Sequence, residues 1–450
     1  MSDADRSLSL SRRRFIVAGG AATAAPWLGR SFSYDASAAE EKPQRPKVAC
    51  VFTEFTYRSH AHVIVENFLL PYYFNGQLTD PGVDIVSFYG DQFPANDMSR
   101  KVAQDFDVPI YPSIDKALCL GGDKLAVDAV LLIGEHGDYP DNEKGQTQYP
   151  RKEFFDQTVA VFRRSGRVAP VFNDKHLSYR WDWAKEMYDT ARQLKIPFMA
   201  GSSVPLAERR PPLELPEEAK IVEAVSIHGG PPERYGYHAL EVLQSFVEFR
   251  AGRETGISGV QFLEGDALWK AADEGKWSVK LAETAMAQEL GAGQPPLREL
   301  AYKLDDADQA HGILVNYRDG MRAMALGLGG NGSRWNFACQ LAGEAKPRAT
   351  RLYNGPWNNR NLFKALSHAI QTFFREGKAP YAVERTLLVT GALDAAMDSR
   401  FRSNVPVATP QLEFAYQPVD FQRMREMGAT WKIITDDTPE PQTIERRNST

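Results

Sequence analysis

The sequence contains little cysteine, has no basic charge balance and lacks any long apolar segment. Only Cys50, Cys119 and Cys339 occur in 450 residues, and no two of them have C-x-x-C spacing. This argues against a disulfide framework and against a structural zinc site. The formal net charge of −5 gives no basic surface for nucleic acid. No stretch reaches the ~20 apolar residues that a membrane-spanning helix needs, so no membrane span is expected.

The first 40 residues resemble an export signal. The motif Ser11-Arg12-Arg13-Arg14-Phe15-Ile16 opens an apolar run, rich in alanine and glycine, that reaches Ala25. This arrangement resembles a twin-arginine signal, and Ala36-Ser37-Ala38 fits a cleavage site of small residues. We therefore expect a periplasmic or otherwise exported protein, and we exclude residues 1–40 from the fold.

Residues 47–204 show apolar runs that alternate with amphipathic segments. The expected strands are residues 47–52, 83–89, 127–133, 168–172 and 196–200, with helices between them. Continuous apolar runs such as VDAVLLI suit strands that are buried on both faces of a parallel sheet. The order predicts a Rossmann-like, doubly wound α/β domain.

The second half of the chain has a different pattern. The proline-rich sequence RRPPLELP predicts a linker within residues 205–221. Strands grouped together, with helices set apart, predict an α/β (α+β) domain over residues 222–400, built on an open, mostly antiparallel sheet. In that domain Asp319-Gly320 marks a hairpin. Residues 401–450 form a C-terminal extension.

Four polar residues, Asn173-Asp174-Lys175-His176, stand where the strand at residues 168–172 should end. Ligands of open parallel sheets bind beyond the carboxyl ends of the strands. The pattern therefore predicts a functional site at these residues. The plainer alternative is that they begin a solvated loop.

The order of segments over residues 47–399 resembles that of the Gfo/Idh/MocA oxidoreductases. Lys175 matches the lysine of the family's Glu-Lys-Pro motif, and residues 127–136 are similar to its strand and loop beneath the nicotinamide. His238, which follows Gly229-Gly230 and the sequence YGY, matches the catalytic histidine. The resemblance implies a Rossmann domain followed by a sheet domain, an NAD(P) cofactor and a homo-oligomer.

The chain departs from this family at the first turn. The family has a G-x-G-x-x-G turn there, whereas residues 53–60 read TEFTYRSH, without glycine. Those glycines let the backbone approach the pyrophosphate, so Phe55, Tyr57 and the anionic Glu54 should obstruct a dinucleotide. Asp91, after the second strand, is a candidate partner for the ribose. We predict that NAD(P) binds weakly or not at all, and the cofactor stays unassigned.

Most of the histidines fall near strand ends or between the two domains. In one hypothesis they bind and polarise a sugar or polyol, with Lys175 and His238 as acid–base groups. In a second, a metal such as zinc or manganese is bound. Its ligands would come from His60, His62, Glu135, His136, Asp174 and His176. In a third, several histidines only hydrogen-bond the backbone of loops.

Two further segments suit a carbohydrate. Glu264 and Asp266, with Trp269 nearby, combine carboxylates that hold hydroxyl groups with a ring that stacks on a sugar face. A surface loop with a buried tryptophan is the alternative. The polar and aromatic loop NGPWNNR, residues 354–360, is open to the same two interpretations.

The leading hypothesis is an exported oxidoreductase-type enzyme that acts on a sugar, polyol or similar hydroxylated substrate. Lys175 and His238 would be the proton-transfer pair, with His176 as a further catalytic candidate. The expected substrate-binding residues are His60, His62, His136, Asp174 and Glu264. The alternatives are a non-redox hydrolase or lyase on the same scaffold, with or without a metal, and a catalytically silent carbohydrate-binding protein.

Overall fold

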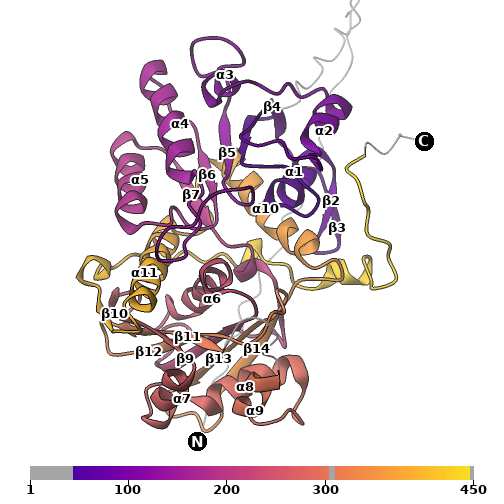
Figure 1. The fold of residues 1–450 in the computed structure, drawn as a ribbon. Helices are drawn as coiled ribbons and strands as arrows, with labels where there is room; N and C mark the ends of the chain where they lie inside the picture. The colour runs from indigo at the N-terminus through magenta and orange to yellow at the C-terminus, as the bar shows by residue number, and fades with distance from the viewer. Residues whose placement is uncertain (1–43, 304–309, 446–450) are drawn as a thin grey trace, which may run out of the picture. The chain divides into compact units, whose positions relative to one another are not determined.

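The first sheet of the computed structural model, which describes residues 44–303 and 310–445, has five parallel strands (Figure 1). In spatial order the strands are β4 (Asp84–Gly90), β1 (Lys47–Phe52), β5 (Ala129–Ile133), β6 (Val171–Asp174) and β7 (Phe198–Gly201). All five residues of β5 are buried, as expected for a strand covered on both faces. The predicted Rossmann-like fold is confirmed. The expected signal, residues 1–40, lies outside the described residues.

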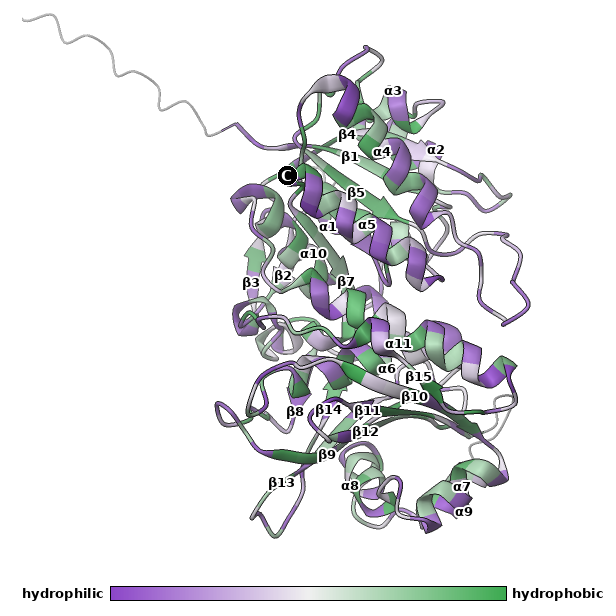
Figure 2. Cartoon of the chain, turned by 90° about the vertical axis from the view of Figure 1, so that its left-hand side faces the viewer, coloured by the Kyte–Doolittle hydropathy of each residue, from purple (hydrophilic) through white to green (hydrophobic). Residues whose placement is uncertain are grey.

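Helices flank both faces of this sheet. They are α1 (His60–Leu69), α2 (Ser99–Phe106), α3 (Ile114–Leu118), α4 (Arg151–Ser165) and α5 (Trp181–Leu194). Figure 2 shows α5 with alternating hydrophilic and hydrophobic residues, whereas β5 and β7 are mainly hydrophobic. An additional hairpin, β2 (Tyr72–Phe74) and β3 (Gln77–Thr79), follows α1.

The second sheet has eight strands. In spatial order they are β15 (Val407–Ala408), β10 (Ile257–Glu264), β11 (His311–Tyr317), β12 (Arg322–Gly327), β9 (Ile221–His228), β13 (Trp335–Leu341), β14 (Arg348–Tyr353) and β8 (Glu208–Arg210). Only the β12–β9 pair is parallel among these described strands, so the mostly antiparallel sheet is confirmed. Strand β8 lies within the segment that the sequence predicts as a linker.

Helices cover both faces of the second sheet. On the face toward the first sheet lie α6 (Pro232–Val247) and α11 (Val383–Phe401) (Figure 1). The other face packs against α7 (Asp266–Asp273), α8 (Val279–Leu290) and α9 (Leu297–Lys303). The sequence pattern does not predict helices over residues 266–303. These three helices bury an apolar face that would otherwise be exposed.

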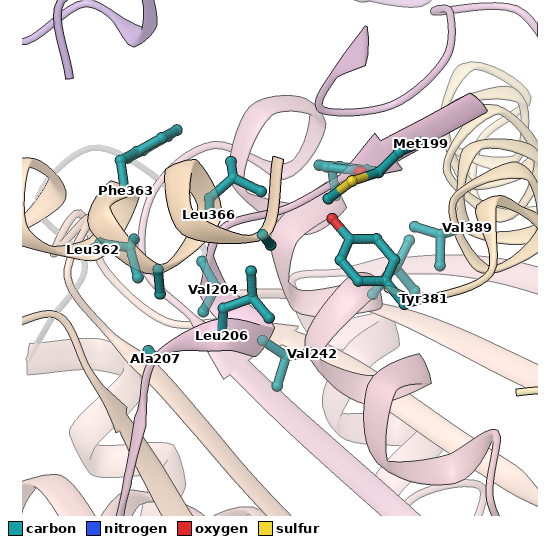
Figure 3. Close-up of a cluster of buried hydrophobic side chains, with 14 of the residues drawn as sticks. Met199, Val204, Leu206, Ala207, Val242, Leu362, Phe363, Leu366, Tyr381 and Val389 are labelled. Carbon is teal, nitrogen blue, oxygen red and sulfur yellow. The ribbon is translucent and has the colours of Figure 1, made fainter. Parts of the chain in front are cut away.

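A shared core joins the two sheets. Figure 3 shows part of it: Met199 from β7, Val242 from α6 and Leu366 from α10 (Asn359–Glu376) point toward one another. Helix α10 also packs along α1, although its sequence position would place it in the second domain. The two sheets are therefore held against each other by buried side chains, which fixes the position of any site between them.

The C-terminal extension returns to the first sheet's helices. The remaining short helices are η1 (Val204–Leu206), η2 (Pro410–Leu412), η3 (Gln422–Met424) and η4 (Ala429–Lys432). Glu440 pairs with Arg58, and Arg360 of α10 donates to the carbonyl of Pro441.

The three cysteines are free and buried. Within the described ranges, no helix combines the length and the apolar character needed to cross a membrane.

Candidate active site

A cavity of about 330 Å³ lies at the carboxyl ends of β5 and β6, between the first sheet and the N-terminal turns of α6. Its walls combine charged, amide and aromatic side chains from both halves of the chain. The polar and aromatic lining residues are Arg58, His60, Glu135, His136, Lys175, Ser203, Arg234, Tyr235, His238, Ser333, Trp335, Asn354, Asn358, Asn359 and Phe363. The topology thus brings four of the residues expected at the site, His60, His136, Lys175 and His238, to one cavity.

Lys175 follows β6 and is paired with a buried carboxylate. Its Nζ donates to Glu135 Oε1 at 2.7 Å and to the carbonyl of Arg234 at 3.3 Å. Glu135 also accepts from the Arg151 guanidinium. Burial alone would raise the pKa of Glu135, but the charges of Lys175 and Arg151 hold that pKa well below its ordinary value. The ionised carboxylate therefore fixes the position of the Lys175 amine in the cavity.

Two histidines stand beside this pair. His60, the first residue of α1, has its Nδ1 2.5 Å from Asp174 Oδ2. Its ring lies 5.0 Å from that of His136, centroid to centroid. Burial, together with the neighbouring His60, lowers the pKa of His136 to about 4. His136 is therefore neutral at pH 7 and can accept or donate a hydrogen bond.

His238 approaches from the other side, on α6. Its Nδ1 lies 2.6 Å from the Ser202 hydroxyl oxygen, which also accepts from the backbone N–H of Val204 at 3.1 Å. Burial and the nearby Lys175 hold the pKa of His238 well below its ordinary value. No hydrogen-bond partner for Nε2 occurs in the described part of the chain. A neutral imidazole with one anchored nitrogen suits proton transfer through the other.

Behind Glu135 lies a second layer of buried polar groups. Arg151 Nη1 is 3.1 Å from His176 Nε2, and Glu233 Oε1 is 3.7 Å from the same atom. Arg151 Nε, His176 Nδ1 and Glu233 Oε1 have no hydrogen-bond partner among the described residues. Burial, reinforced by the charge of Glu135, raises the pKa of Glu233 to about 7. His176 therefore belongs to the layer behind the cavity and is not one of the described residues that line it.

Four residues that line the cavity have left-handed backbone conformations although none is glycine. The φ angles are 64° at Arg58, 71° at His136, 63° at Lys175 and 51° at Asn358. Such conformations are uncommon for residues with a side chain, and they persist where the surrounding structure imposes them. Their concentration around one cavity indicates that it is a functional site.

The other expected residues lie elsewhere. His62 faces away from the cavity: its ring packs near Tyr57 and its Nδ1 accepts from the backbone N–H of Arg58 at 2.8 Å. Glu264 ends β10 and pairs with Arg400 at 3.4 Å. In residues 44–303 and 310–445 no group of three or more His, Cys, Asp or Glu side chains could hold a metal ion. The six residues of the metal hypothesis therefore do not form a ligand set.

Several lining residues are absent from the sequence-based prediction. Tyr235 and Trp335 stack with ring centroids 5.8 Å apart and an interplanar angle of 12°, which gives the cavity an aromatic wall. Asn354, Asn358 and Asn359 come from the polar and aromatic loop noted in the sequence. Aromatic faces with amide, amine and imidazole groups suit a polyhydroxylated ligand.

Solved structures with a similar fold include an NAD complex from antibiotic biosynthesis and inositol dehydrogenases. GenD2 from gentamicin A biosynthesis, in complex with NAD, is 12% identical with a TM-score of 0.52, over 81% of this chain and 96% of that chain. Myo-inositol dehydrogenase from Lactobacillus casei, in complex with NAD(H) and myo-inositol, is 12% identical with a TM-score of 0.52, over 84% and 100%. Identity this low shows the fold alone: a Rossmann-like domain followed by a domain built on a mostly antiparallel sheet. No family model and no curated protein matches the sequence.

The residues around the first turn do not fit a dinucleotide bound in the usual Rossmann position. There the pyrophosphate contacts free N–H groups at the N-terminus of the first helix. In this chain the backbone N–H of His60 faces His136 Nδ1 at 3.4 Å, and that of His62 donates to the Ser59 hydroxyl at 3.3 Å. Phe55, in place of glycine, is fully buried. Two N–H groups of the first turn, those of His60 and His62, are therefore already used by the protein.

The expected ribose contact is also occupied. Asp91 follows β4, and its carboxylate accepts from the Tyr139 hydroxyl at 2.6 Å and from the Tyr89 hydroxyl at 3.1 Å. Gln92 fixes the same loop, because its side chain exchanges hydrogen bonds with the backbone of Asp138. The loop after β5 is thus held against Asp91 and Gln92 by these hydrogen bonds.

Proposed function

We propose that this chain is an enzyme that binds a sugar, polyol or similar polyhydroxylated compound in the cavity and transfers a proton with Lys175 and His238. The observation that carries the proposal is that both side chains line one cavity, each anchored by a buried neighbour: Lys175 by Glu135 at 2.7 Å and His238 by Ser202 at 2.6 Å.

The anchoring gives the two groups complementary chemistry. A neutral His238 imidazole, held through Nδ1, can take a proton from a substrate hydroxyl or C–H group or return one. The Lys175 amine, placed by an ionised Glu135, can donate a hydrogen bond to a substrate oxygen on which negative charge develops. Together the two groups support acid–base chemistry at a carbon that bears oxygen.

The proposed substrate class has two supports. The stacked Tyr235 and Trp335 rings offer a flat apolar face, while the loop asparagines offer amide donors and acceptors. Among the similar folds, myo-inositol dehydrogenase from Lactobacillus casei was solved with myo-inositol. A cyclic polyol or sugar ring would use both kinds of contact.

A non-redox reaction is the second candidate beside hydride transfer, and one observation favours it. The observation behind this choice is the paired N-terminus of α1, where the N–H groups of His60 and His62 face His136 and Ser59. Without a dinucleotide in that position, the same acid–base pair would catalyse an elimination or an epimerisation at a carbon next to a carbonyl or carboxylate group, where the C–H proton can be removed to give an enolate, or the hydrolysis of a glycosidic bond by water. The motif at residues 11–16 supports export by the twin-arginine route, and a homo-oligomer stays a prediction.

The test follows proton transfer directly. The mature protein is incubated in D₂O with inositols, hexoses and sugar acids, with and without NAD(P), and ¹H NMR records exchange or product formation. We expect turnover without added cofactor, and a loss of about 10²- to 10⁴-fold in Lys175→Met. Lys185→Met, on the exposed surface of α5, is the matched control.

Two outcomes would reject the proposal. If Lys175→Met and His238→Gln each retained full turnover of the substrate found, the proton-transfer pair would be wrong. If turnover required NAD(P), the non-redox choice would be wrong and the dehydrogenase hypothesis would be restored.

A further inference from the structure

A second cavity, of about 400 Å³, lies between the segment after β8, the C-terminal end of α6 and the C-terminal extension. None of its lining residues lines the first cavity. Its volume falls within the range of about 300–1,000 Å³ that is typical of small-molecule sites. Phe246, Phe249 and Phe421 give it aromatic walls.

Two buried arginines stand in this cavity with unused hydrogen-bond donors. The Arg425 side chain is 2% exposed, and its Nε and Nη1 have no hydrogen-bond partner in the described ranges. Arg209 donates from Nη1 to the carbonyl of Leu213 at 2.7 Å, while its Nε has no partner there either. Its guanidinium lies 4.0 Å from the centroid of the Phe246 ring. Three nitrogen atoms of charged groups are therefore buried without an acceptor among the described residues.

Three carboxylates line the cavity beside its three arginines, and Glu214 is the one that pairs with Arg209 and Arg425 among the described residues. Glu214 is shared: one oxygen accepts from Arg209 at 3.0 Å and the other from Arg425, and its side chain is 53% exposed. Burial and the charge of Arg425 lower the pKa of Arg209 to about 9. Asp420 also lines the cavity, while Arg253 and Glu217 form a separate exposed pair. Burying a guanidinium with incomplete pairing is unfavourable unless something completes it.

We propose that this second cavity binds a small organic anion, with a phosphate or carboxylate group on Arg209 and Arg425 and an aromatic body against the phenylalanine walls. The planar guanidinium presents parallel N–H donors that match the oxygens of both headgroups. The unpartnered Nε and Nη1 of Arg425 direct their N–H groups to different sides of the guanidinium, so each can donate to a separate acceptor oxygen. Leu215, Pro216 and Phe249 line the same cavity and give apolar contact for an attached aromatic ring.

The experiment uses the mature protein and defined probes: phenyl phosphate, benzoate and inorganic phosphate, each against sodium chloride at equal ionic strength. Calorimetric titration gives the affinity and thermal unfolding gives the stabilisation. We expect saturable binding of phenyl phosphate or benzoate, tighter than that of inorganic phosphate. Arg425→Gln should weaken it at least about tenfold, since a hydrogen bond between charged groups is lost.

Matched variants keep the test decisive. Arg423→Gln changes an exposed arginine two residues away and should leave the affinity unchanged. Arg234→Gln removes an arginine from the first cavity and should also leave it unchanged. If Arg425→Gln does not fold, Gln422→Glu places a negative charge on an exposed residue of the same cavity and should weaken binding several-fold. Absence of saturable binding, an affinity unchanged in the cavity variants, or a loss in Arg234→Gln would overturn the proposal.

Discussion

Two groups of buried charges in this protein differ in how completely they are paired. The first, called here the ion network, consists of Gln244, Glu248, Arg250, Glu254, Arg385 and Tyr416. The second, called the cavity cluster, consists of Glu135, Arg151, Lys175, His176 and Glu233. Within the described ranges every buried nitrogen and oxygen atom of the ion network's side chains has a hydrogen-bond partner, whereas three atoms of the cavity cluster have none.

The ion network has the geometry of a structural element. Arg385 of α11 donates to both oxygens of Glu248, at 2.5 and 3.1 Å, and the Tyr416 hydroxyl donates to Glu248 at 2.6 Å. Arg250 pairs with Glu254 at 3.0 Å in the same way. These bonds tie the end of α6 to α11 and to the C-terminal extension.

The difference in pairing between the two groups indicates where a ligand is expected. A buried charge whose hydrogen bonds are all made holds the fold together, and removing one partner leaves the other uncompensated. A buried charge with donors or acceptors to spare is maintained by the fold at some cost in stability, and a ligand or substrate can complete it. By this criterion the two cavities, and not the ion network, are the places to look for function.

The largest expected effect breaks the ion network. Arg385→Met leaves Glu248 buried without its cation, so the free energy of unfolding should fall by about 3–5 kcal/mol. Urea denaturation followed by circular dichroism measures it. Arg400→Met, on the same helix but 41% exposed, should change stability by less than about 0.5 kcal/mol. If the two variants changed the free energy of unfolding equally, the ion network would not have the structural role assigned to it.

A pH-dependent effect comes next and belongs to the cavity cluster. Burial raises the pKa of Glu233 to about 7, so the folded state binds a proton there that the unfolded state has already lost. This contribution to stability is present below about pH 4.5 and is lost as the pH rises through about 7. Glu233→Gln should therefore gain up to about 3 kcal/mol relative to the parent protein between pH 5 and pH 8.

The measurement is a difference between two proteins, because buried histidines such as His136 change stability in the opposite direction as the pH falls. Urea denaturation at both pH values gives that difference. Glu153→Gln, an exposed glutamate of α4, should show no change with pH relative to the parent. A difference for Glu233→Gln that does not vary with pH would mean that this carboxyl is not held protonated by burial.

The sequence predicts the first sheet well because its strands are buried on both faces. Runs such as AVLLI of β5 cannot be mistaken for an amphipathic surface element. The β2–β3 hairpin is missed, although Asn75-Gly76 is a good turn signal with φ angles of 48° and 78°. Helices α7 to α9 are missed because residues 264–270 are interpreted as a polar loop.

The site is predictable only where strand ends determine it. His136 and Lys175 follow neighbouring parallel strands, whose carboxyl ends meet at one edge. The rule fails for Glu264, because β10 lies in the antiparallel sheet and its end is remote from the cavity. It fails for His62, which is two residues after His60 on a helix and so faces about 200° away. Trp335 comes from β13, and no local sequence pattern connects it to the other residues that line the cavity.

The smallest effect is expected from an added dinucleotide, which should leave the stability of the protein unchanged. The N-terminus of α1 resembles the ion network more than the cavities, because the N–H groups of His60 and His62 already face His136 and Ser59, and Asp91 already accepts from Tyr139. A ligand at 100 times its dissociation constant would add about 2.7 kcal/mol of stability and raise the unfolding temperature measurably. We expect no rise with millimolar NAD(H) or NADP(H), and no dinucleotide in the absorbance or mass spectrum of protein released by denaturation. A clear rise in the unfolding temperature, or a co-purifying dinucleotide, would contradict this expectation. It would show that the hydrogen bonds made by the N–H groups of His60 and His62 do not exclude a ligand, because the protein would exchange them for hydrogen bonds to the pyrophosphate.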